Sequence, residues 1–241
     1  EEALKANPTT KFIYTIPNFQ NPTGKTTTLQ RRREMLALAE KYGVYILEDN
    51  PYGALRFEGE DVKSIKELDT KGNVLYCGTF SKTLAPGLRV GYLLGPSEIT
   101  AKAVVGLQTS TVHTNLAAQM LTYRFLTTVD FDEHLKKLRA IYRHKCRLML
   151  DGLSAELPEF ISFTRPQGGL FIWATLPDKY DMNAFCKGAV ERKVAVVPGN
   201  AFCSDESAVS HSFRLNFSTP TDEQIEKGVK ILGAAAKELL K

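Results

Sequence analysis

The first part of the chain alternates short apolar runs with a segment whose apolar residues recur at helical spacing. The helical segment follows Thr27 and Thr28, either of which could cap it, and it ends at Gly43. A strand, a helix and a strand with short connections predict a parallel pair and a right-handed crossover. The predicted strands are residues 11–16, 44–47, 74–77 and 90–94, and residues 64–68 form a helix or a loop.

From Ser97 onward the pattern becomes helical, and it then changes to short strands mixed with helices. Helices are predicted over residues 97–109, 114–128, 131–157 and 182–192 and at the carboxyl end, and strands over 160–163, 169–174, 194–197 and 212–217. This texture predicts a small α+β domain after the α/β sheet domain. We therefore divide the chain into a partial large domain (residues 1–130), a connecting helix (131–157) and a small domain (158–241).

Composition narrows the functional classes. The 241 residues are 43% hydrophobic, and the net charge of +4 comes from 31 basic and 27 acidic residues. An excess this small gives no support for nucleic-acid binding, and residues 31–33 (RRR) are expected to form a solvated helix face. No apolar run is long enough to span a membrane. The four separated cysteines predict free thiols in a reducing, cytoplasmic compartment, and the histidine contexts predict no metal site.

The stretch with the strongest chemical character is residues 78–91, directly after the third apolar run. Thr79 and Ser81 flank this stretch's lysine, Lys82, and Arg89 follows beyond Pro86 and Gly87. A lysine in a tight turn can become an amine nucleophile, and two hydroxyls with a guanidinium can bind a phosphate. The stretch therefore indicates either a Schiff-base lysine beside an anchored phosphate or a surface loop with an ordinary solvated lysine.

Polar residues also follow the first two predicted strands. Asn21 begins an Asn-Pro-Thr-Gly turn, which is either a structural turn or a means of presenting the Asn21 amide. Asp49 and Tyr52 follow the second strand. Because parallel strands present their carboxyl ends at one sheet edge, we expect Asn21, Asp49, Tyr52 and Lys82 to gather there with Arg89.

These motifs together resemble the fold-type I pyridoxal-phosphate aminotransferases, and within them the branch of 2-aminoadipate, kynurenine and aromatic aminotransferases. The resemblance covers essentially the whole chain, and its strength lies in the order and spacing of the motifs. They are residues 21–24 (NPTG), 48–52 (EDNPY), 79–82 (TFSK), 86–91 (PGLRVG), 166–173 (PQGGLFIW), 197–199 (VPG) and 213–218 (FRLNFS). The implied fold is the carboxy-terminal part of the large cofactor-binding α/β domain plus the small α+β domain.

The resemblance implies a catalytic role for Lys82, which forms the internal aldimine with pyridoxal 5'-phosphate and then moves a proton at the substrate α-carbon. It implies that Asp49 pairs with the pyridine nitrogen and keeps it protonated. Tyr52 and Asn21 would hydrogen-bond the phenolic oxygen of the cofactor.

The resemblance also implies two anion-binding sets. Thr79, Ser81 and Arg89 would bind the cofactor phosphate, with Thr79 in place of the serine that is usual there. Arg214 would bind the substrate α-carboxylate in a bidentate manner, and Asn21 belongs to the substrate site as well. We expect no metal.

The implied reaction exchanges an amino group between an α-amino acid and a 2-oxo acid, with 2-oxoglutarate as the expected acceptor, in a homodimer. Two alternatives stay open: the effector domain of an aminotransferase-like bacterial transcription regulator, and a lyase of the same fold. Phe171 and Trp173 are expected to lie in the core of the small domain rather than to contact ligands.

The chain differs from complete members of the family in one respect: it starts at Glu1 without a methionine, and few residues precede Asn21. The resemblance implies that an aromatic ring stacking on the cofactor and a helix start completing the phosphate site lie upstream. We therefore expect the 241 residues alone to be inactive.

Overall fold

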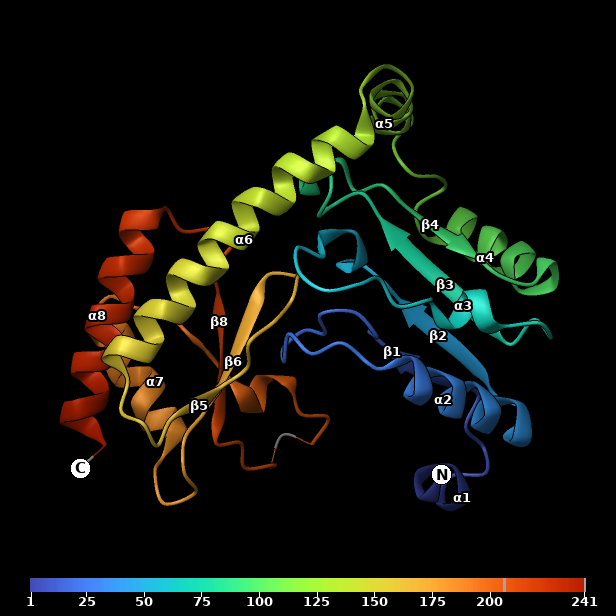
Figure 1. Ribbon diagram of the computed structural model, residues 1–241. Coiled ribbons are helices and arrows are strands. Elements are labelled where there is room, and N and C mark those ends of the chain that lie inside the picture. Colours follow the sequence, from blue (N-terminus) through green and yellow to red (C-terminus); the bar gives the residue numbers. More distant parts are fainter. Residues whose placement is uncertain (206, 241) are drawn as a thin grey trace. The chain divides into compact units, whose positions relative to one another are not determined.

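The computed structural model in Figure 1 describes residues 1–205 and 207–240, which fall into two compact units. The first unit comprises Glu1–Asn18, Thr26–Leu55 and Gly59–Leu138. The second comprises Phe19–Lys25, Arg56–Glu58 and Arg139–Lys241. Each unit has a sheet and a hydrophobic core of its own.

In the described part of the first unit, four strands form one sheet in the order β1-β2-β3-β4. β1 (Phe12–Thr15), β2 (Tyr45–Asp49) and β3 (Val74–Thr79) are parallel, and β4 (Gly91–Leu94) is antiparallel to β3. The predicted strands and the parallel pairing of the first two are confirmed. Because β4 is antiparallel to β3, its first residue, Gly91, pairs with the last residue of β3, Thr79.

The helices of the first unit begin and end where local signals predict. α2 (Leu29–Tyr42) starts at Thr28, whose side chain accepts a hydrogen bond from the Arg31 amide, and it ends at Gly43 in the left-handed conformation with φ 63°. α3 (Ile65–Leu68) starts with a capping box between Ser64 and Glu67. The other helices are α1 (Glu2–Ala6), α4 (Ser97–Ser110), α5 (Leu116–Thr128) and the single turns η1 (Gly53–Leu55) and η2 (Pro86–Leu88).

The two faces of this sheet have different surroundings. Ile13, Ile46 and Val74 point to one face, where they pack with apolar residues of α2 and with Ile65 of α3. Successive strand residues point to opposite faces, so Phe12 and Tyr14 lie on the other face, and each is 54% exposed. By the same alternation and the strand register, Asp49, Cys77 and Thr79 share that second face.

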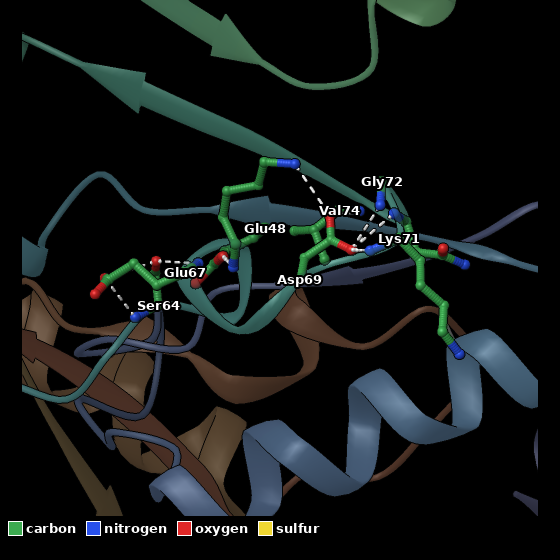
Figure 2. A network of polar contacts seen from close by, with 9 residues as sticks. Glu48, Ser64, Glu67, Asp69, Lys71, Gly72 and Val74 are labelled. Carbon is green, nitrogen blue, oxygen red and sulfur yellow. Dashed lines mark hydrogen bonds and ion pairs between the residues drawn. The ribbon is translucent and has the colours of Figure 1, made fainter.

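A network of polar contacts, shown in Figure 2, fixes the segment between β2 and β3. The buried Glu48 carboxylate accepts hydrogen bonds from the amides of Ile65 and Lys66, at 3.0 and 2.8 Å. Burial raises the pKa of Glu48, while these two hydrogen bonds act in the opposite direction. This side chain therefore ties the first turn of α3 to the end of β2.

Asp69 closes the other end of the same network (Figure 2). Its carboxylate accepts hydrogen bonds from the amides of Gly72, Asn73 and Val74 at 2.9–3.0 Å, and from Lys66 Nζ at 3.0 Å. Burial raises the pKa of Asp69, but the hydrogen bonds lower it more, and the result is about 2. The carboxylate thus holds the turn that starts β3.

In the described part of the second unit, four strands form an antiparallel sheet in the order β5-β6-β8-β7. The strands are β5 (Ser162–Phe163), β6 (Phe171–Thr175), β7 (Val197–Pro198) and β8 (Ser212–Asn216). Helices α7 (Met182–Glu191) and α8 (Asp222–Leu239) and the part of α6 (Phe131–Glu156) from Arg139 onward contribute to its core. The single turn η3 (Gly199–Phe202) follows β7.

The predicted strand over residues 194–197 is only partly correct, because the structure begins β7 at Val197. Lys193 adopts a left-handed conformation with φ 68° after α7, which delays the extended segment. Pro198 ends the strand because it has no amide hydrogen to donate.

Two short segments from earlier in the chain belong to the second unit. Phe19 is 1% exposed and lies against the Gly168–Gly169 backbone, where an added Cβ on Gly168 would come within 2.3 Å of its ring. Phe57 is part of the core of the second unit, its amide donates to the Gln167 carbonyl at 3.0 Å, and its own carbonyl accepts from Arg143. No helix among the described residues is long and apolar enough to cross a membrane.

Candidate active site

Lys82 lies on the turn that follows β3, and the side chains predicted to accompany it are close together. The Thr79 hydroxyl donates to Ser81 Oγ at 3.0 Å, and the Ser81 amide donates to Thr79 Oγ1 at 3.1 Å. Arg89 Nη1 donates to Ser81 Oγ at 3.4 Å. The predicted grouping of two hydroxyls and a guanidinium beside Lys82 is therefore present within the first unit.

The backbone explains how Arg89 reaches this turn. η2 ends at Leu88, and the next residue, Arg89, adopts the left-handed conformation with φ 55° and ψ 37°. For a residue other than glycine this conformation is unfavourable, and such residues gather at functional sites. The chain then enters β4, whose start is paired with the end of β3, so Arg89 is brought back to Thr79 and Ser81. Arg89 also lines a cavity of about 590 Å³ together with His113 and the first turn of α5.

Asp49 is the last residue of β2 and is paired with Cys77 of β3. Its Oδ2 accepts a hydrogen bond of 2.7 Å from the hydroxyl of Tyr14 on β1. Burial raises the pKa of the Cys77 thiol, and the neighbouring Asp49 charge raises it further. Sequence reasoning found Asp49 but missed Tyr14, although the alternation of Phe12, Ile13 and Tyr14 along a strand could have placed Tyr14 on the same face.

Tyr52 is 6% exposed and lies in the turn between β2 and η1. The turn is held by Asn50, whose Oδ1 accepts from the Gly53 amide at 3.1 Å and from Asn18 Nδ2 at 3.0 Å. Asn50 Nδ2 in turn donates to the Tyr76 hydroxyl at 2.8 Å. Asn50 is therefore a supporting residue that sequence reasoning did not single out.

Arg32 corrects one expectation. Its neighbours Arg31 and Arg33 are exposed, as a solvated helix face requires, but Arg32 itself is 0% exposed. Its guanidinium donates to Asn18 Oδ1 at 2.6 Å, to the Pro17 carbonyl at 3.1 Å and to three other carbonyls. The sequence predicts that the whole arginine run is solvated, because it does not show that the surrounding loops offer hydrogen-bond acceptors to Arg32.

Arg214 and Asn21 lie together in the second unit. Arg214 is on β8, between its register partners Trp173 and Val197. Its Nη1 donates to Asn21 Oδ1 at 2.6 Å, so two residues 193 positions apart in the chain are in contact. The two residues predicted to share the substrate site, Asn21 and Arg214, are thus in direct contact within the second unit.

Aromatic rings surround the Arg214 guanidinium, with Phe171 at 4.3 Å and Phe202 at 5.0 Å between the guanidinium carbon and the ring centroid. Phe171 is buried, as expected for a core residue, but it also contacts Arg214. Trp173 packs edge-on against Phe202 at a centroid distance of 5.9 Å. These contacts hold the guanidinium in place.

Cys77, Cys146, Cys186 and Cys203 are free thiols, and burial raises the pKa of Cys146 and of Cys186 to about 12. Among the described residues, no group of three or more His, Cys, Asp or Glu side chains could hold a metal ion.

Comparison with known proteins gives a consistent result. Residues 1–232 match the family described as aminotransferase class I and II. The aromatic-amino-acid aminotransferase 1 of Thermococcus litoralis is 39% identical over all of this chain, which covers 58% of that protein. An uncharacterized HTH-type transcriptional regulator of Bacillus subtilis, YisV, is 32% identical over 95% of this chain, which covers 47% of that protein.

A solved structure agrees with these matches. The kynurenine aminotransferase of Pyrococcus horikoshii, crystallised in complex with PMP, KYN as substrates and KYA as products, superposes with a TM-score of 0.95. It is 39% identical, and the alignment covers 100% of this chain and 59% of that one. The chain thus spans somewhat more than half the length of these aminotransferases, and it belongs to the aminotransferase class I and II family.

Proposed function

We propose that the protein carrying this chain is a pyridoxal-phosphate-dependent aminotransferase that exchanges an amino group between an α-amino acid and a 2-oxo acid, with 2-oxoglutarate as the acceptor. The observation that carries the proposal is the cluster of Thr79, Ser81, Arg89 and Lys82 at the end of β3, in a member of this family. Asp49, at the end of the neighbouring strand, supplies the anionic partner.

The donor set suits the chemistry of this cofactor. Hydroxyls and a guanidinium are good donors to a phosphate dianion, and the Thr79, Ser81 and Arg89 side chains are already hydrogen-bonded to one another. A carboxylate such as Asp49 stabilises a protonated pyridine nitrogen, and a primary amine such as Lys82 can react with an aldehyde. When bound, the cofactor ring supplies an electron sink for the substrate α-carbon.

Each side chain of the first unit then has one task. Thr79, Ser81 and Arg89 would bind the phosphate and fix the position of the ring. Asp49 would hold the proton on the ring nitrogen. Lys82 Nζ would bind the cofactor covalently and afterwards carry the proton to and from the substrate α-carbon.

Tyr52 and the residues of the second unit complete the proposed set. Tyr52 would donate a hydrogen bond to the phenolic oxygen of the cofactor, as Asn21 would on the family pattern. Arg214 would bind the substrate α-carboxylate, and its contacts with Asn21, Phe171 and Phe202 support a fixed orientation of the guanidinium.

The test uses the intact protein with pyridoxal phosphate. Borohydride reduction should fix the cofactor, and peptide mapping should find it on Lys82. Transamination from aromatic amino acids, kynurenine and 2-aminoadipate to 2-oxoglutarate should be lost in Lys82→Ala and kept in Lys102→Ala, which changes an exposed lysine of α4. Cofactor fixed on another lysine, or full turnover in Lys82→Ala, would contradict the assignment.

A regulator remains the second candidate because of the Bacillus subtilis relative. Both functions would use the same cofactor residues, so cofactor binding does not separate them. Turnover does: an intact protein that binds pyridoxal phosphate and amino acids, shows no transamination, and binds DNA would be a regulator.

We also infer that the first unit is the carboxy-terminal part of the large cofactor-binding domain and that the second is the small domain. A homodimer is the proposed assembly. The free cysteines are consistent with a reducing compartment such as the cytoplasm.

A further inference from the structure

The hydrogen bond between Tyr14 and Asp49 is not part of any role described so far. The Tyr14 hydroxyl lies 2.7 Å from Asp49 Oδ2, a distance typical of a charge-assisted O–H···O⁻ bond. The two residues are 35 positions apart in the chain and sit on adjacent strands. The contact therefore depends on the sheet and not on a local turn.

The register of the sheet explains why these two side chains meet. Tyr14 pairs with Leu47 across the parallel β1 and β2 strands, and Asp49 is two residues further along β2. Residues two apart on a strand share a face, so Tyr14, Leu47 and Asp49 all point to the same side. An aromatic side chain is long enough to reach such a diagonal neighbour.

We propose that Tyr14 is a positioning residue for the cofactor: its hydroxyl fixes Oδ2 of Asp49, so that Oδ1 receives the N–H of the cofactor ring. This inference rests on the proposed function, because it assigns Asp49 to the ring nitrogen. Without the Tyr14 hydroxyl, the carboxylate can rotate about its terminal torsion, which is broad and weakly restricted in aspartate.

Tyr14 is suited to be a permanent donor. Partial burial and the hydrogen bond to Asp49 both raise the pKa of Tyr14 above its ordinary value of 10, although the residue as a whole is 54% exposed. The nearby Tyr52 and Cys77 act in the same direction. The hydroxyl therefore keeps its proton over the whole range in which an aminotransferase would work.

The first experiment tests the contact without the cofactor. The intact protein is labelled with ¹³Cζ-tyrosine, and the Tyr14 signal is assigned by its loss in Tyr14→Phe. In the wild-type protein this signal should titrate above the other exposed tyrosines, and in Asp49→Asn its midpoint should fall by at least one pH unit. A midpoint that is ordinary in the wild-type protein, or is unmoved by Asp49→Asn, would overturn the proposal.

The second experiment tests the role toward the ring nitrogen. Dissociation constants are measured for pyridoxal phosphate and for its 1-deaza analogue, in which a carbon replaces that nitrogen. Tyr14→Phe should weaken binding of pyridoxal phosphate about 10-fold, the scale of one hydrogen bond to a charged group, and binding of the deaza analogue less than twofold. Tyr45→Phe is the matched control, because Tyr45 lies on the same sheet face and is 40% exposed.

The outcomes separate this inference from the proposed function. Equal weakening of both cofactors by Tyr14→Phe would show a merely structural role and overturn the inference, while the proposed function would stand. Failure of the wild-type protein to bind pyridoxal phosphate at all would overturn both, even if the cofactor-free titration had found the contact.

Discussion

Replacement of Asp49 should affect the chemistry more than the binding of the cofactor. Asp49→Ala should lower the transamination rate by about 10²–10³-fold, the scale of losing one preorganised electrostatic partner. The phosphate would still be bound by Thr79, Ser81 and Arg89, so the protein should stay loaded at saturating cofactor, although its dissociation constant for the cofactor should rise at least as much as in Tyr14→Phe. Single-turnover kinetics and cofactor absorbance measure the two effects, with the exposed Asp132→Ala as control. A rate within threefold of wild type together with lost cofactor would contradict the role.

Asp69 makes a prediction about stability and pH. Its pKa is about 2 in the folded protein against 3.8 ordinarily, so the folded state favours the ionised form. The stabilisation is complete above about pH 4 and disappears as the pH falls through 2; the shift corresponds to about 2 kcal/mol. Asp69→Asn should therefore lower the free energy of unfolding at pH 7 but hardly at pH 2. Urea unfolding measures this, and Glu60→Gln, at an exposed carboxylate, should have little effect at either pH.

Side chains close together in the chain could be predicted, and side chains joined by the fold could not. Thr79, Ser81 and Lys82 lie within four residues, so their shared chemistry is visible in the sequence. Tyr14 and Arg32 have partners up to 35 and 31 residues away. Strand alternation indicates the face on which Tyr14 lies, but no local pattern indicates the partner of either side chain. A resemblance to a family transfers the residues that define its motifs, but the side chains that support those residues have to be found in the structure.

Element boundaries were predictable where a side chain or a glycine signals the end of a helix. Thr28 and Gly43 bound α2, and the predicted cap and stop are confirmed. The strands are less well bounded, because their ends depend on hydrogen bonds to neighbours. β5 begins at Ser162 rather than at residue 160, since its pairing with β6 starts at Ser162 and the Ile161 amide donates to the Pro158 carbonyl instead.

One hydrogen bond between two elements should keep the turn that carries Lys82 well ordered. His134, in the first turn of α6, donates through Nε2 to the buried carbonyl of Thr83 at 2.7 Å. His134→Ala would leave that carbonyl without its donor, at a cost of about 1–3 kcal/mol. Amide exchange of Leu84 and Ala85, which both donate to Phe80, should then speed up.

The control for this prediction lies on the same helix. His144 is bonded to Asp222 at an exposed site, so His144→Ala should leave the exchange of Leu84 and Ala85 unchanged. Equal exchange in the wild-type protein and in His134→Ala would mean that the turn is held by other contacts.

The separate hydrophobic cores of the two units make a prediction for the whole molecule. Leu153 is 0% exposed in the core of the second unit. Among the described residues, this core has no residue in common with the hydrophobic cluster around Ile46 in the first unit. Leu153→Ala should destabilise the protein by about 2–5 kcal/mol, and amide exchange should rise first in α7 and α8. Ile141→Ala, on the same helix but 51% exposed, should cost much less. Comparable costs for the two variants would contradict this description of the core.

Each unit is built from three separate stretches of the chain, so the protein cannot be cut into two complete units at a single position. Phe19 and Phe57 belong to the second unit, yet both precede the long helix after which most of that unit is encoded. If the gene were divided within α6, the upstream fragment would carry Phe19 and Phe57. The downstream fragment would then lack two aromatic rings that are buried in the second unit, and its interior would contain cavities. Protease nicks in α6 should yield two pieces that stay associated until denaturant is added. An engineer who wants the second unit alone would have to carry the loop around Phe19 and the segment around Phe57 across as grafts.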